Sequence, residues 1–202
     1  MQGGGGDSYE SVAYDARDSS RPHFFLTTDS YDGQLIRFSP DEGIVTHAIE
    51  SDSYWPILSS SGSKKYLVLD PEDGTFIWSS GLSDGQISAS KHFQNSEGID
   101  VRDGMLYFTS KTNKRLYILD LDAGTYTESS TESGAFNNQP DQIARVIGAG
   151  NDSILYFCED GGADCGVHGR NSDGKYFTIL EGLDYATETR SEEHTSELRH
   201  LS

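Results

Sequence analysis

The sequence is poor in basic residues and in cysteine. It has 15 Lys and Arg against 33 Asp and Glu, a formal net charge of -18 at pH 7. Because phosphates repel such a chain, nucleic acid is excluded as a partner.

Cys158 and Cys165 are the only cysteines, too few for a zinc site by themselves and ambiguous as a disulfide pair. No apolar run approaches the roughly 20 residues that a membrane span needs. We expect a monomer that binds neither nucleic acid nor membrane.

Motifs of several enzyme classes are also missing. The histidines at 23, 47, 92 and 168 occur singly, without the His-x-His or His-Glu-x-x-His spacing of zinc hydrolases. No glycine-rich phosphate loop follows a strand and opens a helix, so nothing in the sequence supports nucleotide binding. Residues 61–64 match the Ser-x-x-Lys pattern of some serine acyl enzymes, but their Ser- and Gly-rich surroundings favour a hairpin turn.

One layout recurs along the chain. Residues 24–43 (FFLTTDSYDGQLIRFSPDEG) align without a gap to residues 105–124 (MLYFTSKTNKRLYILDLDAG), at an offset of 81 residues. Residues 66–78 supply a third copy, and residues 154–157 begin a fourth. Each apolar run is short, rich in aromatic and β-branched residues, and bounded by Gly, Asp or Asn. That pattern is typical of antiparallel strands and not of helices.

A fixed period of this size in small antiparallel sheets indicates a β-propeller, in which the first strand of each blade lines a central channel. We therefore predict an all-β protein, with about four blades of antiparallel meander in residues 8–189. A propeller of about six blades at this period would exceed 202 residues, so we expect an incomplete ring. Residues 1–7 are expected to be a disordered, Gly-rich start. Residues 190–202 contain RSEEHTSEL, which looks like a translated sequencing adapter, and are expected to be a non-native tail.

An acidic residue leads most copies of the repeat. The leading positions are Glu10, Trp55, Glu97, Asp141 and Glu188, spaced 45, 42, 44 and 47 residues apart. In a propeller these residues face one axis, where clustered carboxylates are costly unless a cation or protons compensate them. Hard cations with oxygen ligands, calcium first, suit such a group. The alternative is that each carboxylate caps a turn or accepts backbone N–H bonds at the start of a strand.

The fourth copy carries two further candidates. Glu159 and Asp160 follow its first apolar run and are succeeded by two glycines, where the third copy has Ser110 and Lys111. Such a turn can bring backbone and carboxylate close to an ion. The alternative is an ordinary acidic turn, although a turn does not require the second acidic residue.

In their order, these segments resemble the PhoX-like alkaline phosphatase family. The resemblance covers roughly residues 8–189. It rests on YESV with FLTTD in the first copy, EGI with LYFT in the third, and PDQ with CEDG in the fourth. It implies a propeller that hydrolyses phosphomonoesters with calcium, and in some members iron, and that is typically exported. The sequence departs from the family at Thr28, where a Glu is common.

The resemblance implies metal-ligand roles for five carboxylates, with Asp29 and Asp160 as additional candidates. The five are Glu10, Glu97, Asp141, Glu159 and Glu188. The expected chemistry is metal-centred hydrolysis of a small phosphorylated substrate. With its ring incomplete, the chain by itself is expected to be inactive. A second interpretation is a gluconolactonase-like propeller with an axial calcium on Glu97 and Asp141. A third is a non-catalytic propeller that binds a partner on one face.

Overall fold

A computed structural model of the protein describes residues 9–53, 57, 61–145, 154–185 and 188–189. Predictions made for residues 1–7, Trp55 and residues 190–202 lie outside these ranges. The first sheet is built from β1 (Tyr9–Asp15), β2 (His23–Thr28), β3 (Ile36–Pro40), β4 (Gly62–Asp70), β5 (Thr75–Ser79), β6 (Ser96–Arg102), β7 (Met105–Ser110), β8 (Arg115–Asp120) and β9 (Thr125–Ser130). The second contains β10 (Gln139–Arg145), β11 (Leu155–Asp160), β12 (Gly166–Arg170) and β13 (Tyr176–Glu181). The helices are α1 (Glu42–Ser51), α3 (Leu82–His92) and the short 3-10 helix Leu183–Tyr185.

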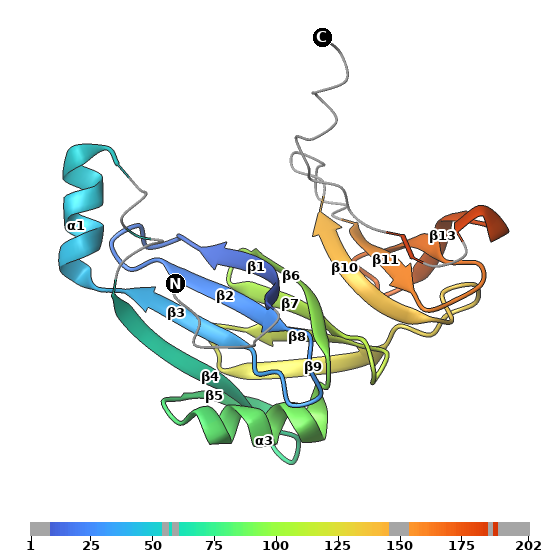
Figure 1. Ribbon diagram of the computed structural model, residues 1–202, viewed down its shortest axis with the longest axis horizontal. Coiled ribbons are helices and arrows are strands. Elements are labelled where there is room, and N and C mark those ends of the chain that lie inside the picture. The colour runs from blue at the N-terminus through green and yellow to red at the C-terminus, as the bar shows by residue number, and fades with distance from the viewer. Residues whose placement is uncertain (1–8, 54–56, 58–60, 146–153, 186–187, 190–202) are drawn as a thin grey trace, which may run out of the picture.

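The first sheet is antiparallel and nearly closed. Its strand order is β1-β2-β3-β4-β5-β9-β8-β7-β6. The two end strands, β1 and β6, pack against each other although they are not neighbours in the hydrogen-bonded order, which gives the sheet a barrel-like form (Figure 1). This curvature brings residues from the beginning of β1 beside residues from the beginning of β6.

The interior of the nine-stranded sheet is apolar and aromatic. Phe108 stacks on Tyr117 with ring centroids 4.8 Å apart, and Phe93 meets the Phe108 ring edge-on at 5.5 Å. All three rings are buried. Helix α3 packs on β4 and contributes the fully buried Ala89. Burial of this apolar surface is the main source of stability in the sheet.

The second sheet is an antiparallel meander in the order β10-β11-β12-β13 (Figure 1). Strand β10 packs on β6 and β7. A second apolar cluster joins the sheets through Leu116, Phe136, Ile143, Leu155 and Phe157. The leading strands β1, β6 and β10 are thus side by side, each followed by its own antiparallel partner.

The strand-rich architecture predicted from the sequence is confirmed, but its division into four blades is not. Strands β4 and β5, from the second copy of the repeat, do not form a separate meander. Instead β4 pairs with β3, and β5 pairs with β9 through Thr75 and Thr125. The first three copies therefore share one sheet.

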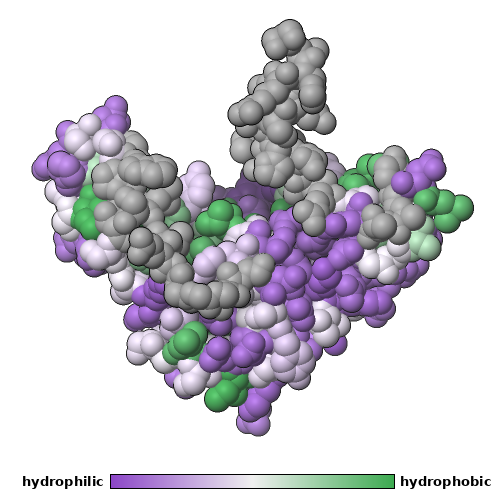
Figure 2. Space-filling view, in the orientation of Figure 1, coloured by the Kyte–Doolittle hydropathy of each residue, from purple (hydrophilic) through white to green (hydrophobic). Residues whose placement is uncertain are grey.

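The sequence pattern predicted neither α1 nor α3, for different reasons. In α3 the buried residues are Gly85, Ser88 and Ala89, whose small side chains give no 3.6-residue hydrophobic signal. Helix α1 begins at Glu42, within the Pro40 to Gly43 segment that resembles a turn in the sequence. Neither helix has the length and apolar character needed to cross a membrane in the part of the chain described. On the face shown in Figure 2, hydrophilic surface predominates and hydrophobic surface is split into small patches.

Candidate functional site

A β-bulge occurs at the same place in all three leading strands. The pairing register shifts between Tyr9 and Val12 in β1, between Ser96 and Ile99 in β6, and between Pro140 and Ile143 in β10. The shifted residues include Glu10, Glu97 and Asp141, the carboxylates that lead the repeats. A bulge bends the strand and re-aims a side chain. The repeated bulge therefore directs the acidic side chain in the same way in all three strands.

Gly98 permits the close approach of β6 and β10. A Cβ atom at this position would lie 2.3 Å from the backbone N of Ile143 and 2.8 Å from the carbonyl oxygen of Asp141. Real Cβ atoms do not approach backbone atoms so closely, so any other residue would push the strands apart. Gly98 therefore lets the backbone of β6 pass close to that of β10, next to Glu97 and Asp141.

Three carboxylates form the candidate site, which we call the acidic cluster: Glu10, Asp29 and Glu97. One oxygen from each lies within 4.8 Å of the others. Calcium binds oxygen at about 2.3–2.6 Å, so oxygens on opposite sides of one ion are up to about 5 Å apart. The spacing therefore fits a single hard cation.

Glu97 is the buried member of the acidic cluster, with a relative exposure of 1%. Its Oε1 atom has no hydrogen-bond partner among the described residues. The Nζ atom of Lys111 lies 3.5 Å from this oxygen, close enough for an ion pair but without hydrogen-bond geometry. Burial, followed by the charges of Asp29 and Asp141, raises the pKa of Glu97 to about 9. This buried oxygen, whose charge is compensated among the described residues only by the ion pair with Lys111, can serve as a ligand for a cation.

Asp141 and Glu188 form a second acidic pair beside this cluster. Asp141 is buried. Burial, and then a hydrogen bond and charge repulsion from Glu188, raises the pKa of Asp141 to about 7. Glu188 is brought here by an isolated bridge to Asp160, at the end of β11. The structure thus gathers the charges of four leading carboxylates, because Glu10 also contributes to the raised pKa of Asp141.

Lys111 is the basic residue of the site, and sequence reasoning did not select it. It forms a 2.5 Å ion pair with Asp160 in addition to its contact with Glu97. From the strand registers, Asp29, Lys111 and Asp160 occupy equivalent positions just beyond the residues paired with Tyr9, Ser96 and Pro140. Aligning these three positions in the sequence would have identified Lys111 as the one basic residue among acidic equivalents.

Amide side chains fix the carboxylates of the cluster. The Asn95 side chain donates to Asp29 Oδ1 at 2.8 Å, and Gln142 donates to Glu10 Oε1 at 3.1 Å. Asn95 has a φ of +50°, a left-handed conformation that Asn adopts more readily than most residues. The Thr27 hydroxyl donates to the backbone carbonyl of Glu97. These contacts hold the oxygens close together despite their mutual repulsion.

Glu159 faces a different environment. Its Oε1 accepts hydrogen bonds from the backbone N–H groups of Asn137 and Asn138, and its Oε2 accepts one from Gly166 and contacts His168 at 3.1 Å. Burial alone would raise the pKa of Glu159, but these hydrogen bonds outweigh it and the pKa is lowered. Because successive strand residues point to opposite faces, Asp160 approaches Lys111 while Glu159 does not.

The two cysteines are not among the candidate ligands, although the charges of Asp141 and Glu188 act on Cys158. Cys158 and Cys165 are buried and do not form a disulfide. Burial raises the pKa of the Cys158 thiol to about 11, so the thiol is protonated at neutral pH. A reactive thiolate at this position is therefore not expected.

Neither a protein-family model nor the sequence of a curated protein matches this chain.

The raised pKa values predict how stability depends on pH when divalent cations are absent. The folded state holds a proton on Glu97 between about pH 5 and about pH 9, and one on Asp141 up to about pH 7, that the unfolded state releases. The free energy of unfolding must then fall as the pH rises. Thermal unfolding in EDTA should show a melting temperature that decreases steadily from pH 5 to pH 9. Saturating calcium should flatten this profile, whereas a melting temperature that rises or stays constant in EDTA would contradict it.

Proposed function

We propose that this chain is part of a calcium-dependent phosphomonoester hydrolase of propeller type. The observation that carries the proposal is the acidic cluster, whose three carboxylate oxygens lie within 4.8 Å of one another. Its buried Glu97 oxygen accepts no hydrogen bond from any described residue. Oxygen-only ligand sets favour hard cations such as calcium. The donor set therefore fits the ion that the resemblance implies.

The propeller part of the proposal draws support from contacts that recur between the units led by Glu10, Glu97, Asp141 and Glu188. Thr27 of β2 donates to the carbonyl of Glu97, and Thr109 of β7 donates to the carbonyl of Asp141 at 2.9 Å. After β11, the backbone N–H of Thr189 donates to the carbonyl of Glu159 at 2.9 Å. Each contact joins the second strand of one unit to the first residues of a later unit. In a propeller, each blade contacts the next in the same way around a central axis.

Each residue of the site has a separate role in the proposed reaction. Glu10, Asp29 and Glu97 would hold calcium, which when bound polarises a phosphoryl oxygen and offsets its charge. Asn95 and Gln142 orient two of these carboxylates. Lys111 supplies a positive charge at the edge of the cluster, where it can attract the anionic substrate. The iron implied by the resemblance would be a second hard cation, for which Asp141 and Glu188 are the adjacent carboxylates.

Hydrolysis assays test this proposal. We expect the protein with a complete ring to cleave p-nitrophenyl phosphate in a reaction that requires calcium, stops in EDTA and is lost in Glu97→Gln. Glu72→Gln is the matched control because Glu72 is exposed in a turn. Cleavage of a gluconolactone instead would favour a lactonase. Calcium binding without turnover of either substrate would retain the cation site, contradict the hydrolase proposal and leave a non-catalytic binding module.

A further inference from the structure

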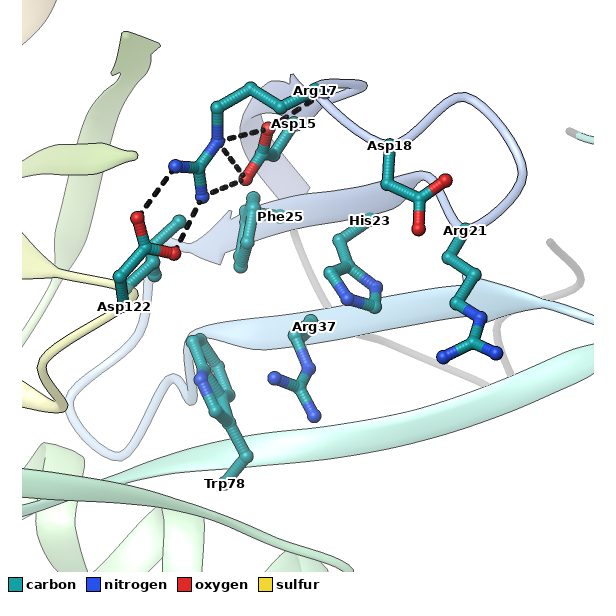
Figure 3. A pocket seen from close by; sticks show the side chains of 10 residues that line it. Asp15, Arg17, Asp18, Arg21, His23, Phe25, Arg37, Trp78 and Asp122 are labelled. Carbon is teal, nitrogen blue, oxygen red and sulfur yellow. Dashed lines mark hydrogen bonds and ion pairs between the residues drawn. The ribbon is translucent and has the colours of Figure 1, made fainter. Parts of the chain in front are cut away.

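A second site is found away from the acidic cluster, in a cavity of about 420 Å³. Inward-facing side chains of the first sheet line it, among them His23 and Phe25 of β2, Arg37 of β3 and Trp78 of β5 (Figure 3). Its volume lies within the range of about 300–1,000 Å³ typical of small-molecule sites. Its wall combines aromatic rings with cationic and acidic side chains, in a protein whose net charge is -18.

Arg37 is the central group of this cavity. Its guanidinium carbon lies 4.9 Å from the centre of the Trp78 ring, and its Nε atom is buried without a hydrogen-bond partner among the described residues. No ion pair joins Arg37 to a carboxylate in the part of the chain that the structure describes. Its cross-strand neighbours are Phe25 and Lys65. A half-buried guanidinium without a counterion is unfavourable unless an anion compensates it.

The acidic residues of the cavity already have other partners. Asp15 and Asp122 both bind Arg17, at 2.9 and 2.7 Å. Asp18 accepts hydrogen bonds from the backbone and hydroxyl of Ser20, at 3.0 and 2.6 Å. Burial lowers the pKa of Arg37, and no carboxylate opposes this effect. An arginine nevertheless remains charged in proteins.

Further donors face the same space. The His23 ring contacts the Ser39 hydroxyl through Nδ1 at 2.8 Å, which leaves Nε2 available. The exposed Arg21 side chain also lines the cavity, and Figure 3 shows it on the side of Arg37 opposite Trp78. An arginine fork, a second arginine and an imidazole can together donate several hydrogen bonds to one oxyanion. Phe25 and Trp78 provide apolar surface for the remainder of a ligand.

We propose that this cavity binds a small organic oxyanion, a carboxylate or a phosphate, with Arg37 as its principal ligand. The shared chemistry is a negatively charged group of two or more oxygens that accepts from the guanidinium, attached to an apolar body that contacts the aromatic wall. This site is distinct from the cation site and does not depend on the proposed hydrolase activity.

Titrations with benzoate, phenylphosphonate and inorganic phosphate test the proposal. They are run in EDTA so that no cation at the acidic cluster can bind the anion. We expect saturable binding of at least one probe, weakened about tenfold or more in Arg37→Met, which keeps the apolar stem on Trp78. Arg115→Gln is the matched control, since Arg115 lies outside the cavity, is partly exposed and pairs with Glu128. The relative affinities for benzoate and for the two phosphorus-containing probes show whether the site prefers a carboxylate or a phosphate.

Two outcomes would overturn the proposal: no saturable binding of any probe to the wild-type protein, or undiminished binding to Arg37→Met. If Arg37→Met does not fold, the ¹⁵Nε resonance of Arg37 in the wild-type protein decides. A shift that saturates with added probe supports the site, and an unchanged resonance rejects it. Arg21→Gln, at an exposed position, should weaken binding by a smaller factor.

Discussion

Replacing Glu97 by Gln should raise the melting temperature of the calcium-free protein at pH 8 and weaken calcium binding by at least about tenfold, or about 1.4 kcal/mol. The two effects have one origin. In wild type, folding without a cation requires Glu97 to take up a proton, because burial and the neighbouring carboxylates raise its pKa to about 9. Gln has nearly the same shape and requires no proton, so the mutant avoids that cost. It also removes one anionic ligand from the site.

Calorimetry measures both effects of Glu97→Gln. Differential scanning calorimetry in EDTA gives the change in melting temperature, and isothermal titration gives the calcium affinity. Glu72→Gln removes a carboxylate from an exposed turn and should leave both quantities unchanged. Equal calcium affinity in Glu97→Gln and wild type would mean that the acidic cluster is not the cation site. A lower melting temperature of Glu97→Gln in EDTA would contradict the raised pKa.

Glu159→Gln should destabilise the protein by about 3 kcal/mol or more, because it removes a buried charged acceptor that serves several donors. The wild-type carboxylate accepts from the backbone N–H groups of Asn137, Asn138 and Gly166 and contacts His168, whose ring stacks on Phe136 at 4.3 Å. In Gln, one oxygen is replaced by an NH₂ group directed at other donors. Urea unfolding measures the loss of stability.

The calcium affinity of the folded Glu159→Gln protein separates the two roles considered for this residue. A structural role predicts unchanged affinity and faster amide exchange at Asn138 and Gly166. Glu128→Gln is the control, since Glu128 is exposed and its ion pair with Arg115 is a surface contact worth little. A stable Glu159→Gln protein that binds calcium more weakly would instead establish Glu159 as a metal ligand, as the resemblance implies.

Local chemistry made much of the strand pattern predictable. The alignment of residues 24–43 with 105–124 corresponds to β2 with β3 and to β7 with β8, two antiparallel pairs. Turn residues explain the boundaries of the second pair, since Lys114 and Gly124 both adopt positive φ. The leading carboxylates could also be identified from the sequence, because they recur at the same position of the repeat. Such features depend on neighbours a few residues apart.

Tertiary packing decided which of those residues belong together. No local signal required β4 and β5 to join the first sheet, and this pairing depends on partners about 25 to 50 residues away along the chain. Strand alternation allowed either Glu159 or Asp160 to face the acidic cluster, and the pairing of β10 with β11 selected Asp160.

Local sequence patterns therefore predicted strands, their hairpins and the acidic residue that leads most copies of the repeat. Only the tertiary arrangement brings Glu97 to Asp29 and Lys111, and places Arg37 at a cavity where no described carboxylate pairs with it. The physical reason is that propensity and turn chemistry act between near neighbours, whereas burial and charge compensation depend on groups brought together from distant parts of the chain.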